Sequence, residues 1–264
     1  MLHLLLLSVG LLMAFPFFWM VATSLKTPDE VALFPPALLP AAPQWHNYPD
    51  AWNAAPFGRY FLNSVGMAGA VTFGVMGTAL LAGYAFGRME FPGRQALFVL
   101  YLATMMIPFE VVLIPNFLLI NRLGWYNSYQ ALIVPWVSNV FSVFLLTQFF
   151  RSLPNDFFEA AQLDGCGHPR FLIAIAAPLA RPALATAGLF AFLGSWNSLL
   201  WPLLVTNADL MRPIEVGLQS FLQQEGPRPH LLMAASTVAM LPIVGLFFLT
   251  QRTFIEGVAA GVKG

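Results

Sequence analysis

Few residues of this chain are of a type and spacing that would support catalysis, metal binding or nucleotide binding. The four histidines are dispersed and none lies in an HExxH pattern, so no zinc site of that kind is indicated. Cys166 is the single cysteine, which excludes a disulfide within the chain and a CxxC site. Neither Lys26 nor Lys263 lies in a GxxxxGK[ST] loop, the backbone cradle for nucleotide phosphates. We therefore expect no catalytic residue, no metal site and no cofactor bound by this chain itself.

Two polar positions interrupt long apolar stretches and are candidates for function. Glu110 lies between Pro108 and Pro115, and an ionisable side chain at membrane depth indicates function by default. It would gate or line a path, or couple transport to protons, unless it reaches water at the outer end of its helix. Asn197 follows Ser195 and Trp196 and needs a polar partner in hydrocarbon. These three residues either line a polar path for a solute or contact a neighbouring helix.

The composition is that of a membrane protein. Of 264 residues, 58% are hydrophobic and 9% are charged, whereas a soluble domain is about 25% charged. Lys+Arg and Asp+Glu number 12 each, so the net charge is zero. A nucleic-acid partner is not expected, because the few basic residues form no stripe along the sequence.

The elements that must position the polar residues are six apolar stretches, each long enough to cross a bilayer. A spanning helix needs about 20 mostly apolar residues. We predict an all-α integral membrane protein with one domain over residues 1–264, and we interpret the internal prolines as kinks in membrane helices. The expected spans are residues 2–25, 64–87, 96–119, 130–150, 183–206 and 231–250.

Basic residues favour an orientation with both termini in the cytoplasm. Six spans place the termini on the same side as the segments 88–95 and 151–182, and that side carries seven Lys or Arg residues against five on the other. A signal peptide is the alternative for the first span, but this span has no basic leader and its apolar core is too long.

Small residues recur every four positions in two of the predicted spans. Helices in lipid approach each other through small side chains, so each stripe is expected to pack against protein. A stripe of this kind serves ordinary bundle packing or a surface that slides during transport. The stripes are Gly66, Ala70, Gly74 and Thr78 in the second span and Ala183, Ala187, Ala191 and Ser195 in the fifth.

The segment 151–182 combines charge, a helical pattern and sharp punctuation. Ser152 is a candidate helix cap with Pro154 in the first turn, and Gly165 is a candidate left-handed residue after the last turn. Pro169 favours the start of a second helix, which Pro178 and Pro182 would interrupt. On the first helix, one face is expected to carry Phe157, Ala160, Ala161 and Asp164.

These residues resemble a known motif. Glu159-Ala160-Ala161, then Asp164-Gly165, then Pro178 are similar to the EAA loop in membrane subunits of binding-protein-dependent ABC importers. The resemblance continues through Pro182–Ala185 and Gly194–Leu203 and points to the carbohydrate-uptake branch, with maltose-type and glycerol-3-phosphate-type permeases. Weaker matches lie at Thr23–Lys26, after the first span, and at Gly261–Gly264, the last residues of the sequence.

The resemblance implies a division of labour among subunits. In that family the EAA helix, a cytoplasmic helix-turn-helix between the fourth and fifth spans, docks into an ATPase cleft. Glu159 would make the polar contact, Ala160 and Ala161 would permit close seating, and Gly165 would turn the chain. The implied partners are two ATPase subunits that hold ATP and Mg²⁺, a second permease of different sequence, an extracytoplasmic solute-binding protein and membrane lipid. The implied location is the bacterial inner membrane.

Two other classes of protein compete with this interpretation. A secondary transporter or channel would use Glu110 and the kinked third span as its coupling site. A membrane-embedded enzyme would need clustered His, Asp or Glu, which the sequence does not supply. The leading prediction is therefore an ABC importer permease that forms the path for a sugar or sugar-like solute.

Overall fold

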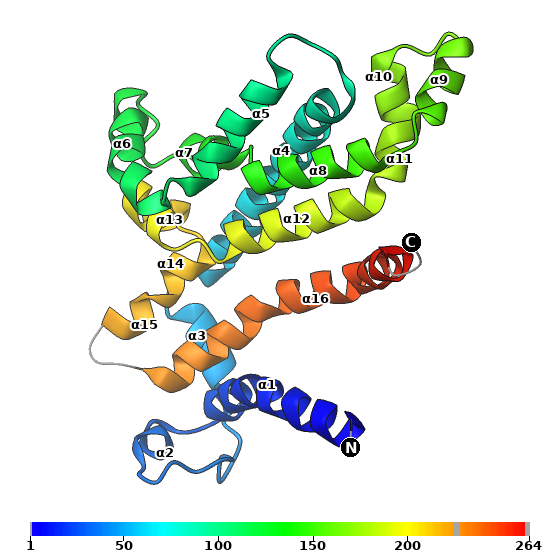
Figure 1. Cartoon of the computed structure of the whole chain (residues 1–264). Helices are drawn as coiled ribbons and strands as arrows, with labels where there is room; N and C mark the ends of the chain where they lie inside the picture. The colour runs from blue at the N-terminus through cyan, green and yellow to red at the C-terminus, as the bar shows by residue number, and fades with distance from the viewer. Residues whose placement is uncertain (1, 224–227, 262–264) are drawn as a thin grey trace. The chain divides into compact units, whose positions relative to one another are not determined.

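The computed structural model describes residues 2–223 and 228–261, and all regular elements in these ranges are helices. The chain divides into two compact units. The first unit comprises Met1–Asn63 and Ala208–Gly245, and the second unit comprises Ser64–Asn207 and Leu246–Gly264. Two long helices continue across the boundaries of the units, α4 (Phe57–Arg88) and α16 (Pro229–Gly261) (Figure 1).

The first unit begins with the apolar helix α1 (Leu2–Ser24), which matches the predicted first span. None of its described residues is buried before Ala22, as expected of a helix whose side chains face lipid. The remaining short helices of this unit are α2 (Pro28–Ala32), α3 (Asn47–Asn53), η4 (Asp209–Met211), α14 (Ile214–Leu218) and α15 (Ser220–Gln223).

Polar contacts hold the loop after α1 in place. The Lys26 ammonium donates to the carbonyl of Ala37 at 2.6 Å and lies 4.3 Å from the centre of the Trp19 ring. The Glu30 carboxylate accepts N–H bonds from Thr27 at 2.9 Å and from Ala41 at 2.8 Å. These backbone bonds lower the pKa of Glu30, so the carboxylate stays ionised and caps α2.

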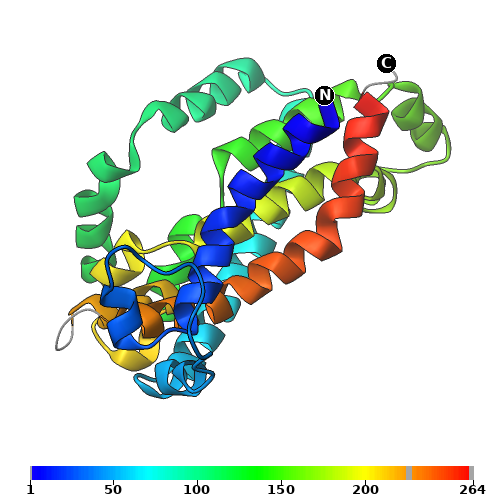
Figure 2. The same cartoon turned by 90° about the horizontal axis from the view of Figure 1, so that it is seen from below.

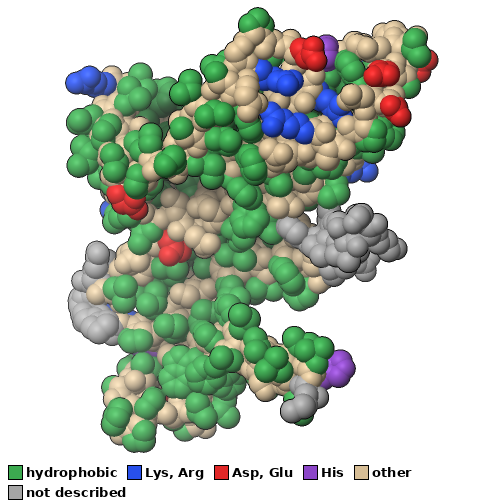
Figure 3. Space-filling model, in the orientation of Figure 1, with side chains coloured by type: hydrophobic (Ala, Val, Ile, Leu, Met, Phe, Trp, Pro, Cys, Tyr) green, Lys and Arg blue, Asp and Glu red, His purple; other side chains and the backbone are tan. Residues whose placement is uncertain are grey.

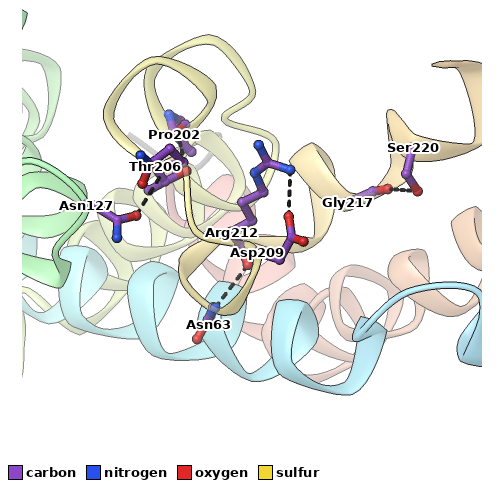
Figure 4. Close-up of polar contacts among 9 residues, drawn as sticks. Asn63, Asn127, Pro202, Thr206, Asp209, Arg212, Gly217 and Ser220 are labelled. Atoms are coloured by element: carbon purple, nitrogen blue, oxygen red, sulfur yellow. Dashed lines mark hydrogen bonds and ion pairs between the residues drawn. The ribbon is translucent and has the colours of Figure 1, made fainter. Parts of the chain in front are cut away.

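A second set of contacts fastens the segment after residue 207 to the start of α4. The Asn63 amide donates to the carbonyls of Leu210 at 2.8 Å and Arg212 at 3.0 Å. Arg212 and Asp209 form an ion pair at 2.8 Å, and both lie beside Asn63 in Figure 4. Nearby, burial raises the pKa of Glu215 on α14.

The second unit holds most of the packed helices. Its α8 packs along α12, and α13 packs against α6 and α7. The elements after α4 are α5 (Arg94–Ala103), η1 (Thr104–Met106), α6 (Phe109–Arg122), α7 (Tyr129–Ile133), η2 (Val134–Trp136), α8 (Val140–Ser152), α9 (Asp156–Leu163), α10 (His168–Phe171), the π-helix η3 (Leu172–Ala176), α11 (Ala177–Leu179), α12 (Arg181–Trp196) and α13 (Leu200–Val205).

The prediction of a continuous third helix over 96–119 is wrong. The segments Arg94–Met106 and Phe109–Arg122 meet at 99°, and Figure 2 shows them running in different directions. Ile107 has extended backbone angles and Pro108 precedes the first residue of α6. A residue before proline is disfavoured in the helical region, so the helix ends there. Pro115 lies inside α6, as predicted for a kink.

The fifth predicted span also differs from the structure. The helix α12 begins at Arg181 and ends at Trp196, and α13 follows after a short break. Within the described residues, four helices are long and apolar enough to cross a membrane, and the number reaches six if each of two bent pairs is one span.

The small-residue stripes are only partly buried. In the fifth predicted span, Ala183, Ala187 and Ala191 are buried, as expected. In the second, Gly66 is exposed, whereas the Thr78 hydroxyl donates to the Val137 carbonyl at 2.7 Å. Gly74 of the predicted stripe also approaches a neighbour closely, because a Cβ atom there would lie 2.7 Å from Val137. A second close contact, outside the predicted stripe, lies further along α4. A Cβ atom at Gly83 would lie 2.6 Å from Leu146, and one at Gly87 would lie 2.8 Å from Phe150.

Candidate coupling segment and cavity

The segment with the EAA-like motif forms a helix, a turn and a second helix within the second unit. The first helix, α9, runs from Asp156 to Leu163. The expectation that Ser152 caps it is wrong, because Ser152 is the last residue of α8 and donates to the Phe149 carbonyl at 2.7 Å. Asn155 precedes α9 instead, and Asp156 and Glu159 lie in the first turn, where the helix dipole favours negative charge.

The end of α9 is confirmed at Gly165. Gly165 has a φ of +73°, a left-handed conformation that glycine adopts at low cost. Its N–H bonds the Gln162 carbonyl at 2.9 Å, and the Cys166 N–H bonds the Ala161 carbonyl at 2.9 Å. This pair of bonds is a Schellman motif, which satisfies carbonyls at the helix end and fixes the direction of the turn.

The predicted contact face of α9 is divided between surface and interior. The Phe157 side chain is 49% exposed, and Glu159, Ala160 and Asp164 are also exposed. Ala161 is only 6% exposed and packs inside the chain. Figure 3 shows acidic side chains on the surface of this end of the second unit, as the sequence of α9 requires. Phe157, Glu159, Ala160 and Asp164 therefore form the exposed part of this face.

The second helix of the segment is longer than predicted. It begins at α10 with Pro169 in the first turn, continues through η3 and includes Pro178 in α11. The chain bends by 79° between Leu179 and Arg181 rather than at Pro178. Pro178 thus lies inside the last helical turn before the bend, and Pro182 lies in the first turn of α12.

A cavity of about 230 Å³ lies within the second unit, between α4, α12 and the segment from α7 to α8. Its wall includes the rings of Trp136 and Trp201, which meet edge to face at 5.9 Å. The Trp201 indole donates to the Ala131 carbonyl at 2.9 Å, which fixes its ring. The polar side chains on the wall are Ser138, Asn139, Ser195 and Ser198.

The polar groups of this cavity retain hydrogen-bonding capacity. Asn139 accepts the Ser142 N–H at 3.0 Å through its carbonyl oxygen, which leaves the amide N–H groups. Among the described residues, no hydrogen bond engages the hydroxyls of Ser195 and Ser198. Aromatic faces beside free hydroxyl and amide groups suit a ligand with apolar faces and many hydroxyls.

The four predicted path residues are not brought together. Ser195 lines the cavity, whereas Trp196 is buried and stacks on Phe192 at 5.5 Å. Asn197 is exposed at the end of α12 and does not line the cavity. Glu110 is exposed in the first turn of α6, directly after the 99° bend. Within the described residues, no group of three His, Cys, Asp or Glu side chains is placed to hold a metal ion.

Comparison with known proteins decides the family. Residues 79–259 match the binding-protein-dependent transport system inner membrane component. The chain belongs to this family. The permease is 33% identical over 269 residues to the sn-glycerol-3-phosphate transport system permease protein UgpE of Yersinia enterocolitica, an alignment that covers 99% of the chain and 96% of the relative.

Two further relatives come from other bacteria. The arabinooligosaccharides transport system permease protein AraQ of Bacillus subtilis is 33% identical, with 98% of the permease and 93% of the relative covered. The diacetylchitobiose uptake system permease protein NgcG of Streptomyces coelicolor is 32% identical, with 98% and 87% covered.

A solved structure shows the same fold. It is a crystal structure of a bacterial ABC transporter involved in the import of the acidic polysaccharide alginate. The TM-score is 0.81 at 22% identity, and the match covers 96% of the permease and 94% of that chain. The permease is therefore a multi-pass membrane protein with the fold of an ABC transporter subunit. The sequence analysis also found a weak resemblance to the importer family at Gly261–Gly264. Residues 262–264 of that match lie outside the described residues.

Sequence reasoning missed three residues of the cavity, Ser138, Asn139 and Ser198. The pair Ser138-Asn139 follows Pro135 and Trp136 in an apolar stretch, and Asn139 caps α8. A cap residue at mid-span signals a break in the membrane helix, where backbone and side-chain polar groups are tolerated if they line a cavity. This signal was available in the sequence.

Proposed function

We propose that the permease forms part of the path by which a sugar or sugar-like solute enters a bacterial cell. It pairs with a second permease of different sequence and receives solute from an extracytoplasmic binding protein. Two separate ATPase subunits, which hold ATP and Mg²⁺, drive the cycle. Membership of the family, together with relatives named for glycerol 3-phosphate and oligosaccharides, supports this assignment.

The observation that carries the coupling part of the proposal is the exposed face of α9. Phe157 is a large apolar side chain that is half exposed, and Ala160 beside it leaves room for a partner to approach. Glu159 adds a carboxylate for a polar contact. The helix ends in a fixed turn at Gly165, so a force on this face moves a defined segment.

The lining of the cavity supports a sugar or sugar-like solute. Two indole rings on one wall offer apolar surface, and hydroxyl and amide groups on the other walls offer donors and acceptors. A sugar ring has apolar C–H faces and a rim of hydroxyls, which this combination suits. Ser195 is thus the strongest of the sequence-predicted path residues.

The proposed orientation places α9 and both chain termini in the cytoplasm. The exposed acidic face of α9 belongs to a segment rich in polar residues, and the basic residues of the sequence favour the same side. The inner membrane is the location implied by the family description.

Uptake by a reconstituted complex tests the proposal. Vesicles that contain the permease, its paired permease and the ATPase subunits are expected to accumulate solute only with ATP and the binding protein. Ala160→Trp blocks the docking face, so uptake should fall at least tenfold while membrane insertion is unchanged. Ala161 is buried, so Ala160 is the better site for this substitution. Normal uptake by Ala160→Trp, or ATP-independent uptake by the permease alone, would contradict the proposal.

A further inference from the structure

The segment with the EAA-like motif, residues 151–182, is the coupling segment. Its second helix is bonded to α4. The Tyr84 hydroxyl on α4 lies 2.8 Å from Nδ1 of His168, the first residue of α10. Tyr84 is 3% exposed, and its ring packs edge to face on Phe150 at 5.7 Å. The His168 ring also stacks on Phe158 of α9 at 4.9 Å. One imidazole therefore links α9, α10 and α4.

A second attachment lies near the first helix of the segment. Arg88, the last residue of α4, donates from Nη1 to the Asn155 side-chain oxygen at 2.6 Å. Its Nη2 donates to the Leu153 carbonyl. Leu153 follows α8 and Asn155 precedes α9, so one guanidinium fastens the ends of three helices. A planar fork of donors fixes both distance and direction, which a single ammonium does not.

The end of α4 packs closely on α8. A Cβ atom at Gly83 would lie 2.6 Å from Leu146, and one at Gly87 would lie 2.8 Å from Phe150, so the two helices are in close contact at both positions. Phe150 and Leu146 are fully buried. The end of α4, α8 and the coupling segment thus behave as one packed body.

The covalent route from the coupling segment to α12 is less suited to carry a push. It passes through the π-helix Leu172–Ala176 and then through the 79° bend before Arg181. A π-helical turn and a sharp bend are places where helices flex or kink. A displacement of α9 would be absorbed there in part.

The helix α4, in contrast, connects the attachment to the cavity without interruption. It is a 32-residue helix with no proline, and Met67, Val71 and Val75 on the same helix line the cavity wall. Tyr84 lies nine positions after Val75, a distance of about 14 Å along a helix that rises about 1.5 Å per residue. A shift of the attached end is therefore transmitted to the cavity.

We propose that α4 is the transmitting element of the permease. It receives the movement of the coupling segment through Tyr84–His168 and through Arg88, and it carries that movement to the cavity wall. Tyr84, Arg88 and His168 are positioning residues in this mechanism. The inference rests on the proposed coupling to an ATPase, and it adds the route that the movement takes.

The coupling ratio of the reconstituted complex tests this route. The measured quantity is solute accumulated per ATP hydrolysed, normalised to the amount of assembled complex. Tyr84→Phe removes only the hydroxyl and keeps the buried ring, and it should lower the ratio about two- to tenfold, the effect of losing one neutral hydrogen bond. Arg88→Gln should lower it further, and Arg88→Lys should restore only part of the loss. Tyr48→Phe is the matched control, because the Tyr48 hydroxyl makes a similar 2.8 Å contact with Ser24 in the first unit.

The outcomes separate the route from the coupling itself. If the wild-type complex couples and both Tyr84→Phe and Arg88→Gln keep the wild-type ratio, the route is wrong while the proposed function stands. If these variants lower only the amount of assembled complex, with the ratio per complex unchanged, their role is structural and the inference fails. If the wild-type permease binds no ATPase, the proposed function fails first. A lowered ratio with intact assembly and an unaffected Tyr48→Phe variant supports the route.

Discussion

Gly165 shows how one residue sets the shape of the proposed docking segment. Its positive φ is a conformation that costs a residue with a Cβ about 1–2 kcal/mol, and more for a branched side chain. The turn at Gly165 fixes where α10 begins relative to α9. The direction of the exposed Phe157 and Ala160 side chains therefore depends on this glycine.

Gly165→Val is expected to abolish uptake without preventing membrane insertion. The branched side chain would force the turn out of the left-handed conformation and move the docking face. Gly165→Asn should keep most of the activity, because asparagine tolerates this conformation better than other residues. Gly167→Ala is the control, since a Cβ atom there meets no neighbour and its backbone is extended. Wild-type uptake by Gly165→Val would exclude the turn from coupling.

At the residue level, the sequence predicted the glycine turn at Gly165 correctly. The prediction that Ser152 caps α9 was wrong. Ser152 and Asn155 are both of a residue type that caps helices, but α8 extends to Ser152, so Asn155 is the residue that precedes α9. The position of Ala161 was also beyond pattern analysis. Two adjacent alanines lie about 100° apart on a helix, and only the packing of α9 on α10 determines which one is buried.

At the level of helices, α4 approaches α8 closely at two glycines. The glycines Gly83 and Gly87 are four residues apart and let the backbones approach, as small residues do in membrane bundles. The predicted stripe on the same helix also approaches a neighbour closely, because a Cβ atom at Gly74 would lie 2.7 Å from Val137. Several small residues recur at this spacing along α4. Periodicity locates a stripe but does not choose among several.

Gly83→Ala should destabilise the permease by about 1–3 kcal/mol, because the new methyl group would overlap Leu146 Cβ. Gly77→Ala on the same helix is the matched control. A Cβ atom at Gly77 meets nothing within 4 Å, and alanine there gains about 0.5–1 kcal/mol of helix preference over glycine. Thermal unfolding in mild detergent measures both. Equal midpoints for the two variants would refute the close contact.

The broken helices explain which parts of the fold were not predictable from composition. Hydropathy found six apolar stretches, and two of them contain a turn rather than a kink. Pro108 and Pro115 occur in the same stretch, yet only Pro108 ends a helix. In water a proline in either place would end a helix, and in a bundle the neighbouring helices decide whether the freed backbone groups are satisfied.

For the whole molecule, the proposed mechanism links the exposed face of α9, as the surface for a partner, to the cavity of the second unit, as the binding site for a solute. The family and its carbohydrate-related members were predictable, because the EAA-like loop and the residues that follow it are specific motifs. The cavity was predictable only in part. Ser195 was found because it lies beside Asn197, a polar residue in an apolar stretch, whereas Ser138 and Asn139 come from a different span that also lines the cavity.

Substitutions in the cavity should change transport without changing assembly. Ser195→Ala removes a hydroxyl that lines the cavity and should raise the solute concentration for half-maximal uptake about two- to tenfold. Asn197→Ala removes an exposed amide that lies outside the cavity lining and should have the smaller effect. Uptake measured against solute concentration in the reconstituted complex compares them. A larger effect for Asn197 would place the path at the end of α12 instead.

Site-directed cross-linking between the permease and its ATPase subunit tests the central claim most directly. In a Cys166→Ala background, Ala160→Cys would be paired with single cysteines along the proposed cleft of the ATPase. We expect a disulfide cross-link at Ala160→Cys and none at Gln95→Cys, an exposed position in the first turn of α5. An Ala160→Cys thiol that stays free and fully reactive toward a water-soluble maleimide in the assembled complex would contradict it.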